Sequence, residues 1–259
     1  MERLGNHYKK TGITVNALRL WALLFLAAGV LGRGVIQKHI LGFSGMGIQQ
    51  MLEVMQSSET AMNHVAMALA LQALEACAAP LYVYLLVEGV GHTSDFRKYF
   101  CRVLAAAVIT EIPYNLAMGV GALDFGSRNP VFGLVLAMIM IYFYQRYSEP
   151  GMQNLLTKML MTLACFAWVK MLNIEFGMPV LLLTAVMWAT RNEGACRKLA
   201  GAGASIACSI FSTFFLASPM AFIAIHLCNG EKGEDNRVAN YLMYPGILLI
   251  AYAACRMLF

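Results

Sequence analysis

The sequence predicts an all-α protein, a polytopic transmembrane helix bundle of about nine spans, and its composition and the pattern of its apolar runs support this. Hydrophobic residues make up 59% of the 259 positions, charged residues make up only 13%, and the mean hydropathy is +0.63. A soluble domain usually carries about 25% charged residues. No polar stretch is long enough for a separate domain, so residues 1–259 are predicted to form a single transmembrane domain.

The apolar runs place the expected helices in order along the chain. The first run covers about residues 15–36, and a weakly amphipathic stretch at 46–55 is expected to lie at the membrane interface. A long run at 64–90 is interrupted by Glu75. The later spans are expected at about 101–120, 131–147, 155–172, 178–190, 199–216, 220–228 and 241–259.

The weakest boundary in this series lies at Ala217-Ser218-Pro219. A proline inside a span is tolerated only where neighbouring groups satisfy the freed backbone. The region is therefore compatible either with two short spans or with one broken helix. For this reason a total of eight to ten spans fits the sequence, with nine as the central expectation.

The distribution of basic residues predicts which end of the chain faces the cytoplasm. With nine spans and a cytoplasmic N-terminus, only five of the 19 lysines and arginines fall on the outer side: Arg33, Lys38, Arg128, Lys170 and Arg256. An excess of basic residues on the cytoplasmic side is typical of membrane proteins. The N-terminus is therefore expected in the cytoplasm.

The charge and the cysteines argue against some other kinds of partner. The net charge is +5, but no basic stripe with interleaved aromatic residues appears, so a nucleic-acid partner is not expected. The seven cysteines form no C-x-x-C pair, and most lie within or beside apolar runs. They are interpreted as small buried residues, and no spacing typical of metal ligands is evident.

Carboxylates within apolar runs are candidate functional groups, because a charged group in a membrane usually faces the bundle interior and has a partner. Glu88 and His92 are four residues apart and would share one face of a continuing helix. A carboxylate beside an imidazole raises its basicity, which suits a general base. The alternative is a structural cap at a helix end near the lipid headgroups.

Glu111 lies in the middle of a predicted span, two residues before Pro113. Proline removes one helical hydrogen bond. The freed carbonyl, together with Glu111, Tyr114 and Asn115, could line a cavity. A polar clamp between helices explains the same pattern equally well.

Three further polar features have simpler interpretations. The turn around Glu175 favours exposure of that carboxylate to solvent, and Glu75 has no evident partner. The segment Asn229-Gly230-Glu231-Lys232-Gly233 is typical of a tight turn at the membrane surface.

Six short motifs, taken together and in order, resemble the TraX family. They span residues 80–245, which is most of the chain, and each motif alone is weakly specific. The motifs are Pro80-Leu81 through Leu86-Val87-Glu88-Gly89 to His92-Thr93, Thr110-Glu111-Ile112-Pro113-Tyr114-Asn115-Leu116, Asn129-x-Val131-Phe132, Glu175-Phe176-Gly177, Asn229-Gly230-Glu231-Lys232-Gly233 and Tyr241-x-x-Tyr244-Pro245.

The resemblance implies a protein of the bacterial inner (cytoplasmic) membrane that is tied to conjugation and to N-terminal acetylation of pilin. It also implies kinship with membrane acyltransferases that use acetyl-CoA as the donor. The partners it implies are membrane lipid and a peptide, pilin or glycan acceptor. By this resemblance His92, Glu88 and Glu111 are the expected catalytic residues, and Tyr114, Asn115, Glu175 and Tyr244 are expected to line the substrate cavity.

The residues expected to bind acetyl-CoA come from two parts of the chain. Asn229 and Glu231 follow from the resemblance. Arg97, Lys98 and Arg102 lie close to the Glu88–His92 motif on the predicted cytoplasmic side, where they could make charge-assisted contacts with the coenzyme A phosphates.

The chain also departs from the family pattern in its first span. Gly29-Val30 stands where the family pattern carries an Asp-His pair, and Asn115 and Glu175 replace aspartates. Three functions therefore stay open: a membrane acyltransferase with His92 as the base, a non-catalytic relative that binds a lipid, peptide or assembly partner, and a small transporter. The sequence shows no internal repeat, which disfavours the transporter.

Overall fold

A computed structural model describes residues 12–43, 46–124, 126–233 and 237–258, and within them the chain is helical with no extended strand. Arg3, Lys9 and Lys10, which the topology prediction places in the cytoplasm, lie outside the described residues. The α-helices are α1 Val15–Gly29, α2 Ile48–Ser57, α3 Glu59–Ala76, α4 Ala78–His92, α5 Phe96–Ala117, α6 Val131–Arg146, α7 Met152–Met171, α8 Gly177–Ala189, α9 Gly194–Ala207, α10 Ala221–Leu227 and α11 Arg237–Leu258. A π-helix, η1 Val30–Ile40, and two 3₁₀ segments, η2 Cys208–Ile210 and η3 Thr213–Met220, complete the set.

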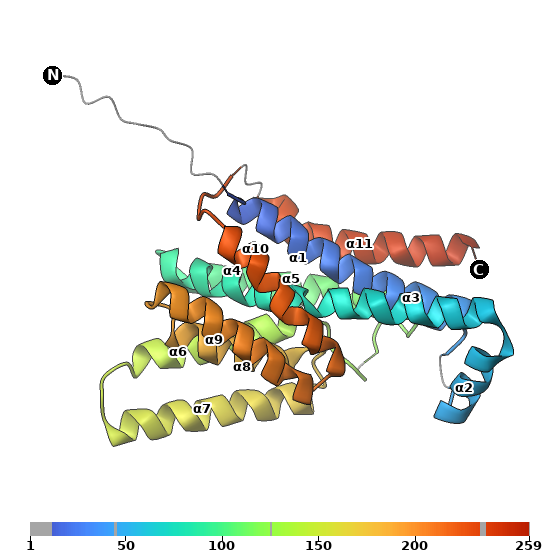
Figure 1. Cartoon of the computed structure of the whole chain (residues 1–259). Coiled ribbons are helices and arrows are strands. Elements are labelled where there is room, and N and C mark those ends of the chain that lie inside the picture. Colours follow the sequence, from blue (N-terminus) through green and yellow to red (C-terminus); the bar gives the residue numbers. More distant parts are fainter. Residues whose placement is uncertain (1–11, 44–45, 125, 234–236, 259) are drawn as a thin grey trace.

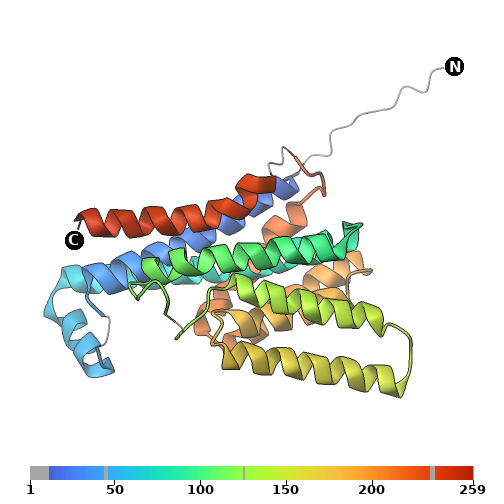
Figure 2. The same cartoon turned by 180° about the vertical axis from the view of Figure 1, so that it is seen from behind.

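The helices form two groups that are joined by α4 and α5 (Figures 1 and 2) and by η3, which also packs against α3. One group packs α1, η1, α3 and α11 together, and the other packs α6, α7, α8, α9 and η3. Helix α4 contacts α1 on one side and α8 on the other, while α5 contacts α11 and α6. Helix α2 projects from the start of α3, away from the bundle (Figure 1).

Several links between helices lie at one end of the molecule. The α4–α5, α6–α7 and α8–α9 links lie there, together with the start of α1 and residues 228–233 after α10 (Figures 1 and 2). We call this the basic end, because these links and the first halves of the helices after them carry Arg97, Lys98, Lys158, Arg191 and Lys232. The sequence assigns the same residues to the cytoplasmic side, and that orientation stays a prediction.

Three described helical stretches are long and apolar enough to cross a membrane: Val15–Ile40, Glu59–His92 and Phe96–Ala117. Val131–Arg146, Gly177–Ala189 and Thr213–Leu227 are shorter apolar helices. The all-helical, membrane-type fold agrees with the sequence prediction. The total of nine spans and the location of α2 at an interface stay predictions.

The first stretch changes helix type halfway along its length. The α-helix α1 passes directly into the π-helix η1 at Val30, within the run that the sequence predicted as one span at about 15–36. Gly29 at this junction packs against α3, and a Cβ there would overlap the carboxyl group of Glu75. A Cβ at Gly32 would lie 2.9 Å from the carbonyl oxygen of Ala68. The glycines therefore allow α3 to approach closely at this junction.

The second stretch is two helices rather than one. Helix α3 ends at Ala76 and α4 begins at Ala78, with Cys77 between them. Pro80 lies in the first turn of α4, where a missing backbone N–H costs little. The break lies one residue after the buried carboxylate Glu75, so the junction brings that side chain to the inner end of α4.

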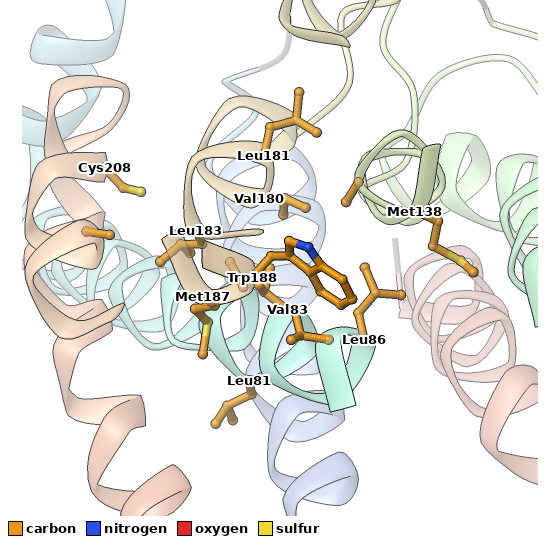
Figure 3. Close-up of a cluster of buried hydrophobic side chains, with 14 of the residues drawn as sticks. Leu81, Val83, Leu86, Met138, Val180, Leu181, Leu183, Met187, Trp188 and Cys208 are labelled. Atoms are coloured by element: carbon orange, nitrogen blue, oxygen red, sulfur yellow. The ribbon is translucent and has the colours of Figure 1, made fainter. Parts of the chain in front are cut away.

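The main apolar core joins α4, α6 and α8. Figure 3 shows Trp188 of α8 beside Val83 and Leu86 of α4, with Val180 on the same side of α8. Trp188 is 5% exposed, and Met138 of α6 is fully buried in the same cluster. This core holds α4 in a fixed position against the second group of helices.

The region around Pro219 differs from the sequence prediction. The chain turns at residues 208–212, and Pro219 lies inside the helical stretch Thr213–Leu227. The predicted span at 199–216 is therefore wrong in its boundary: α9 ends at Ala207 and the next stretch begins at Thr213. The Ser218 hydroxyl donates to the carbonyl of Phe215 at 2.6 Å, within its own stretch, and its oxygen lies 3.4 Å from the carbonyl oxygen of Ser205 in α9.

Candidate functional site

A cavity of about 740 Å³ opens among α1, α4, α5 and α11. One part of its wall belongs to the basic end, where Glu88, His92, Arg102 and Lys232 line it. Another part lies inside the bundle, where Glu75, Thr110 and Tyr244 line it. We call the first part the mouth and the second the interior. The cavity is large enough for a small ligand, and its walls combine apolar side chains with many polar and charged ones.

The mouth brings Glu88 and His92 together as their spacing predicts. The Nδ1 atom of His92 lies 2.9 Å from the carbonyl oxygen of Glu88 and 3.5 Å from its carboxylate. Since a carbonyl oxygen only accepts hydrogen bonds, Nδ1 donates to it, and the lone pair of the neutral ring lies on Nε2. The ring is 80% exposed. This geometry leaves Nε2 able to accept a proton from a bound molecule.

Glu88 has a second partner that the sequence did not predict. Arg197, near the start of α9, forms an ion pair with the Glu88 carboxylate. The Arg197 guanidinium also lies 4.8 Å above the ring of Tyr84. Its Nε and Nη2 atoms are buried without a hydrogen-bond partner in the described part of the chain. The ion pair joins α4 to α9 at the edge of the mouth.

The three basic residues predicted on α5 have different positions. Arg102 lines the cavity, whereas Arg97 and Lys98 do not. Lys98 pairs instead with Asp95, the residue that caps α5, at 3.2 Å. The backbone N–H of Lys98 donates to the Asp95 carboxylate, and this bond together with the Lys98 ammonium lowers the pKa of that carboxyl below its ordinary value.

The turn predicted at 229–233 packs against the start of α1. The backbone N–H of Val15 donates to the carbonyl of Glu231 at 2.8 Å, and that of Asn229 donates to the carbonyl of Ile13 at 3.0 Å. Asn229 and Glu231 themselves do not line the cavity, but Gly230 and Lys232 between and beside them do. The turn therefore forms part of the mouth through its neighbouring residues.

A cluster of charges that the sequence did not predict lies beside the interior part of the cavity, which only its member Glu75 lines. Arg33 of η1 pairs with both Glu75 of α3 and Glu175 before α8. The hydroxyl of Tyr114 donates to Glu175 at 2.6 Å, and the Arg33 guanidinium lies 5.3 Å from the ring of Phe176. We call Arg33, Glu75, Glu175 and Tyr114 the interior cluster. The prediction that Glu175 is exposed to solvent is wrong, because its side chain is only 16% exposed. The prediction that Glu75 lacks a partner is also wrong, because its side chain is 2% exposed and pairs with Arg33.

Glu111 forms a clamp between α5 and the segment before α6. Its carboxylate accepts from Nη1 of Arg128 at 2.7 Å and from the side-chain amide of Asn129 at 2.6 Å. Asn115 similarly binds the loop after α5, donating to the carbonyls of Ala122 and Asp124. Neither Glu111 nor Asn115 lines the cavity, nor do Tyr114 and Glu175, while Tyr244 does. The geometry favours the clamp over the cavity for Glu111, and the predicted functional roles stay predictions.

Sequence reasoning missed the residues that pair with the carboxylates. Three arginines were used only to predict topology: Arg33, Arg128 and Arg197. Their carboxylate partners lie 42, 17 and 109 positions away along the chain, which is too far for spacing to reveal the pairs. One signal was available: an arginine inside the first apolar run is costly unless it finds a carboxylate. The sequence contains such carboxylates, but spacing alone cannot pair them.

The fold and the site define a helical membrane protein with a polar, partly charged cavity inside the bundle. The TraX protein family model matches residues 54–254, which is most of the chain. The chain therefore belongs to the TraX family, as its six motifs indicated. No curated protein and no solved structure matches it.

Proposed function

We propose that this protein is a membrane acyltransferase of the bacterial inner membrane that transfers an acetyl group from acetyl-CoA to an amine or hydroxyl acceptor. The observation that carries the proposal is the mouth of the cavity, where the Glu88–His92 pair and basic side chains line the same hollow. Membership of the TraX family supports the same reading, through the resemblance to proteins of pilin acetylation and conjugation. The pilin, peptide or glycan acceptor is part of the proposal.

The chemistry needs a base and a place for the donor's phosphates. The acceptor nitrogen or oxygen attacks the carbonyl carbon of the thioester, His92 Nε2 takes the acceptor proton, and the coenzyme A thiolate leaves. Glu88 stabilises the imidazolium that forms, since its carboxylate lies 3.5 Å from the ring. Arg102 and Lys232, which also line the mouth, bind the phosphates of coenzyme A.

The test measures binding of acetyl-CoA to the purified full-length protein by calorimetry. Arg102→Ala is expected to weaken binding roughly three- to tenfold, because one charge-assisted contact is lost. Arg97→Ala is the matched control: it removes the same charge from the same helix, outside the cavity. Equal effects of the two variants, or no saturable binding by the folded protein, would contradict the proposal.

A second candidate function is a non-catalytic relative that binds a lipid, peptide or assembly partner in the same cavity. A specific observation favours it: Gly29 lies where the family pattern carries an Asp-His pair, and the space beside it is filled by Glu75 of α3. The first span therefore supplies no side chain at Gly29 that could act as a general base. Saturable acetyl-CoA binding together with acetyl transfer that His92→Ala abolishes would exclude this candidate.

A further inference from the structure

A second hollow lies outside the cavity, on the surface formed by α6, α7 and α8. It is a groove of about 610 Å³ near the basic end of the molecule. Its walls are mainly apolar: Leu155, Met159 and Leu163 of α7 face Ala185 and Ala189 of α8. The three α7 side chains are between half and two-thirds exposed. An apolar groove on a helix of a membrane protein is a surface where acyl chains can lie.

Two cations lie in this groove. Lys158 comes from the first half of α7, and Arg191 follows the end of α8. Arg191 is held in place, because its guanidinium lies 4.2 Å above the Trp188 ring and Nη1 donates to the Trp188 carbonyl at 2.9 Å. Neither cation forms an ion pair within the described part of the chain, and the residues lining the groove include no acidic side chain.

Neutral polar groups connect the walls at the same place. The hydroxyl of Thr162 donates to the carbonyl of Lys158 at 2.7 Å, so the Tyr144 hydroxyl donates to Thr162 Oγ1, also at 2.7 Å. This pair ties α6 to α7. Gln145 and Ser148 add further hydrogen-bonding groups to the lining. The groove therefore combines an apolar path with a cationic, hydrogen-bonding region.

We propose that this groove binds an anionic phospholipid of the surrounding bilayer. The phosphate-containing headgroup binds Lys158 and Arg191, and an acyl chain lies along Leu155, Met159 and Leu163. Two cations without an acidic partner match an anionic headgroup, whereas a zwitterionic lipid brings its own cation and gains less. The apolar walls match an acyl chain, which a free phosphate lacks. Basic pockets between membrane helices bind such headgroups in this way.

The position of Trp188 allows a direct test. The chain has three tryptophans, and Trp21 and Trp168 are about half exposed while Trp188 lines the groove. A Trp21→Phe/Trp168→Phe background therefore leaves one fluorophore beside the proposed lipid. The protein is titrated in detergent micelles with phosphatidylglycerol or phosphatidylcholine carrying brominated acyl chains, which quench a nearby indole. We expect phosphatidylglycerol to quench at a concentration on the order of tenfold lower.

The cations are then removed in the same background. Lys158→Gln/Arg191→Gln is expected to abolish the difference between the two lipids. Lys170→Gln/Arg256→Gln is the matched control, since it removes the same charge from exposed positions outside the groove. Because Arg191 lies against the Trp188 ring, far-UV circular dichroism and the thermal unfolding midpoint, rather than the emission spectrum, report that each variant is folded. Equal quenching by both lipids, no quenching by either, or a preference that survives Lys158→Gln/Arg191→Gln would each overturn the proposal.

Discussion

The interior cluster and the mouth lie beside the same cavity, which Glu75 of the cluster lines, but the two regions hold their charged groups in different ways. In the interior cluster, the side chains of Glu75 and Arg33 are 2% and 19% exposed and come from different helices. At the mouth, Glu88 is 30% exposed and His92 is 80% exposed, and both come from one helix. A buried charge must be paired, whereas an exposed one can leave its partner and react. We infer that the interior cluster positions helices; under the proposed function the mouth carries the chemistry.

The largest expected effect tests the interior cluster. Arg33→Met leaves two carboxylates without the guanidinium that both contact, which is expected to lower the free energy of unfolding by about 3–5 kcal/mol. The measurement is thermal unfolding of the detergent-purified protein. Lys170→Met is the control, because Lys170 is an exposed cation of α7, and it should change the midpoint little. Equal midpoints for both variants would show that the cluster does not hold the fold.

The next effect concerns the space that the cluster needs. Gly29→Ala places a methyl group where the Glu75 carboxyl lies, and overpacking of this kind costs about 1–3 kcal/mol. Gly91→Ala is a suitable control, because nothing lies near its added Cβ. In a Glu75→Ala background the cost of Gly29→Ala should shrink. A cost that stays the same in that background would mean that the two residues do not interact.

At the mouth the expected effect on activity is large and that on stability is small. His92→Ala should change the free energy of unfolding by no more than about 0.5 kcal/mol, since the side chain is largely exposed. Under the proposed function it should slow acetyl transfer by about 10²–10⁴-fold, the usual contribution of a general base. The two measurements are thermal unfolding and transfer of labelled acetyl from acetyl-CoA to membrane components. A destabilised variant with normal transfer would reverse the roles assigned to the two regions.

The smallest effect concerns the exposed start of α5, beside the mouth. Hydrogen bonds from Lys98 lower the pKa of Asp95 in the folded protein below its ordinary value of 3.8. The ionised cap therefore stabilises the fold above that ordinary value, and this contribution is lost as the pH falls through the lowered pKa. Unfolding midpoints of the native protein and Asp95→Ala are expected to differ at pH 6 and to converge in acid. A difference that persists unchanged in acid would contradict this account.

The sequence predicted much of the helical framework. Apolar runs located α6, α7 and α8 to within three residues and α5 to within five, because an apolar helix must be buried or face lipid along its whole length. The Glu88–His92 pair was also predictable, since four residues separate neighbours on one helix face. The break at Cys77, the π-helix after Gly29 and the turn at 208–212 were not, because each depends on contacts with another helix.

By itself the sequence determined the helical membrane character of the chain, its family and the local pair at the mouth. Those properties rest on composition, periodicity and short spacings, which act between residues close in the chain. Only the tertiary structure decided that Arg33 joins Glu75 and Glu175, that Glu111 clamps Arg128, and that Arg102 rather than Arg97 lines the cavity. The physical reason is that a charge inside a bundle is stabilised by whichever opposite charge the packing brings near it, and that packing depends on all the helices together.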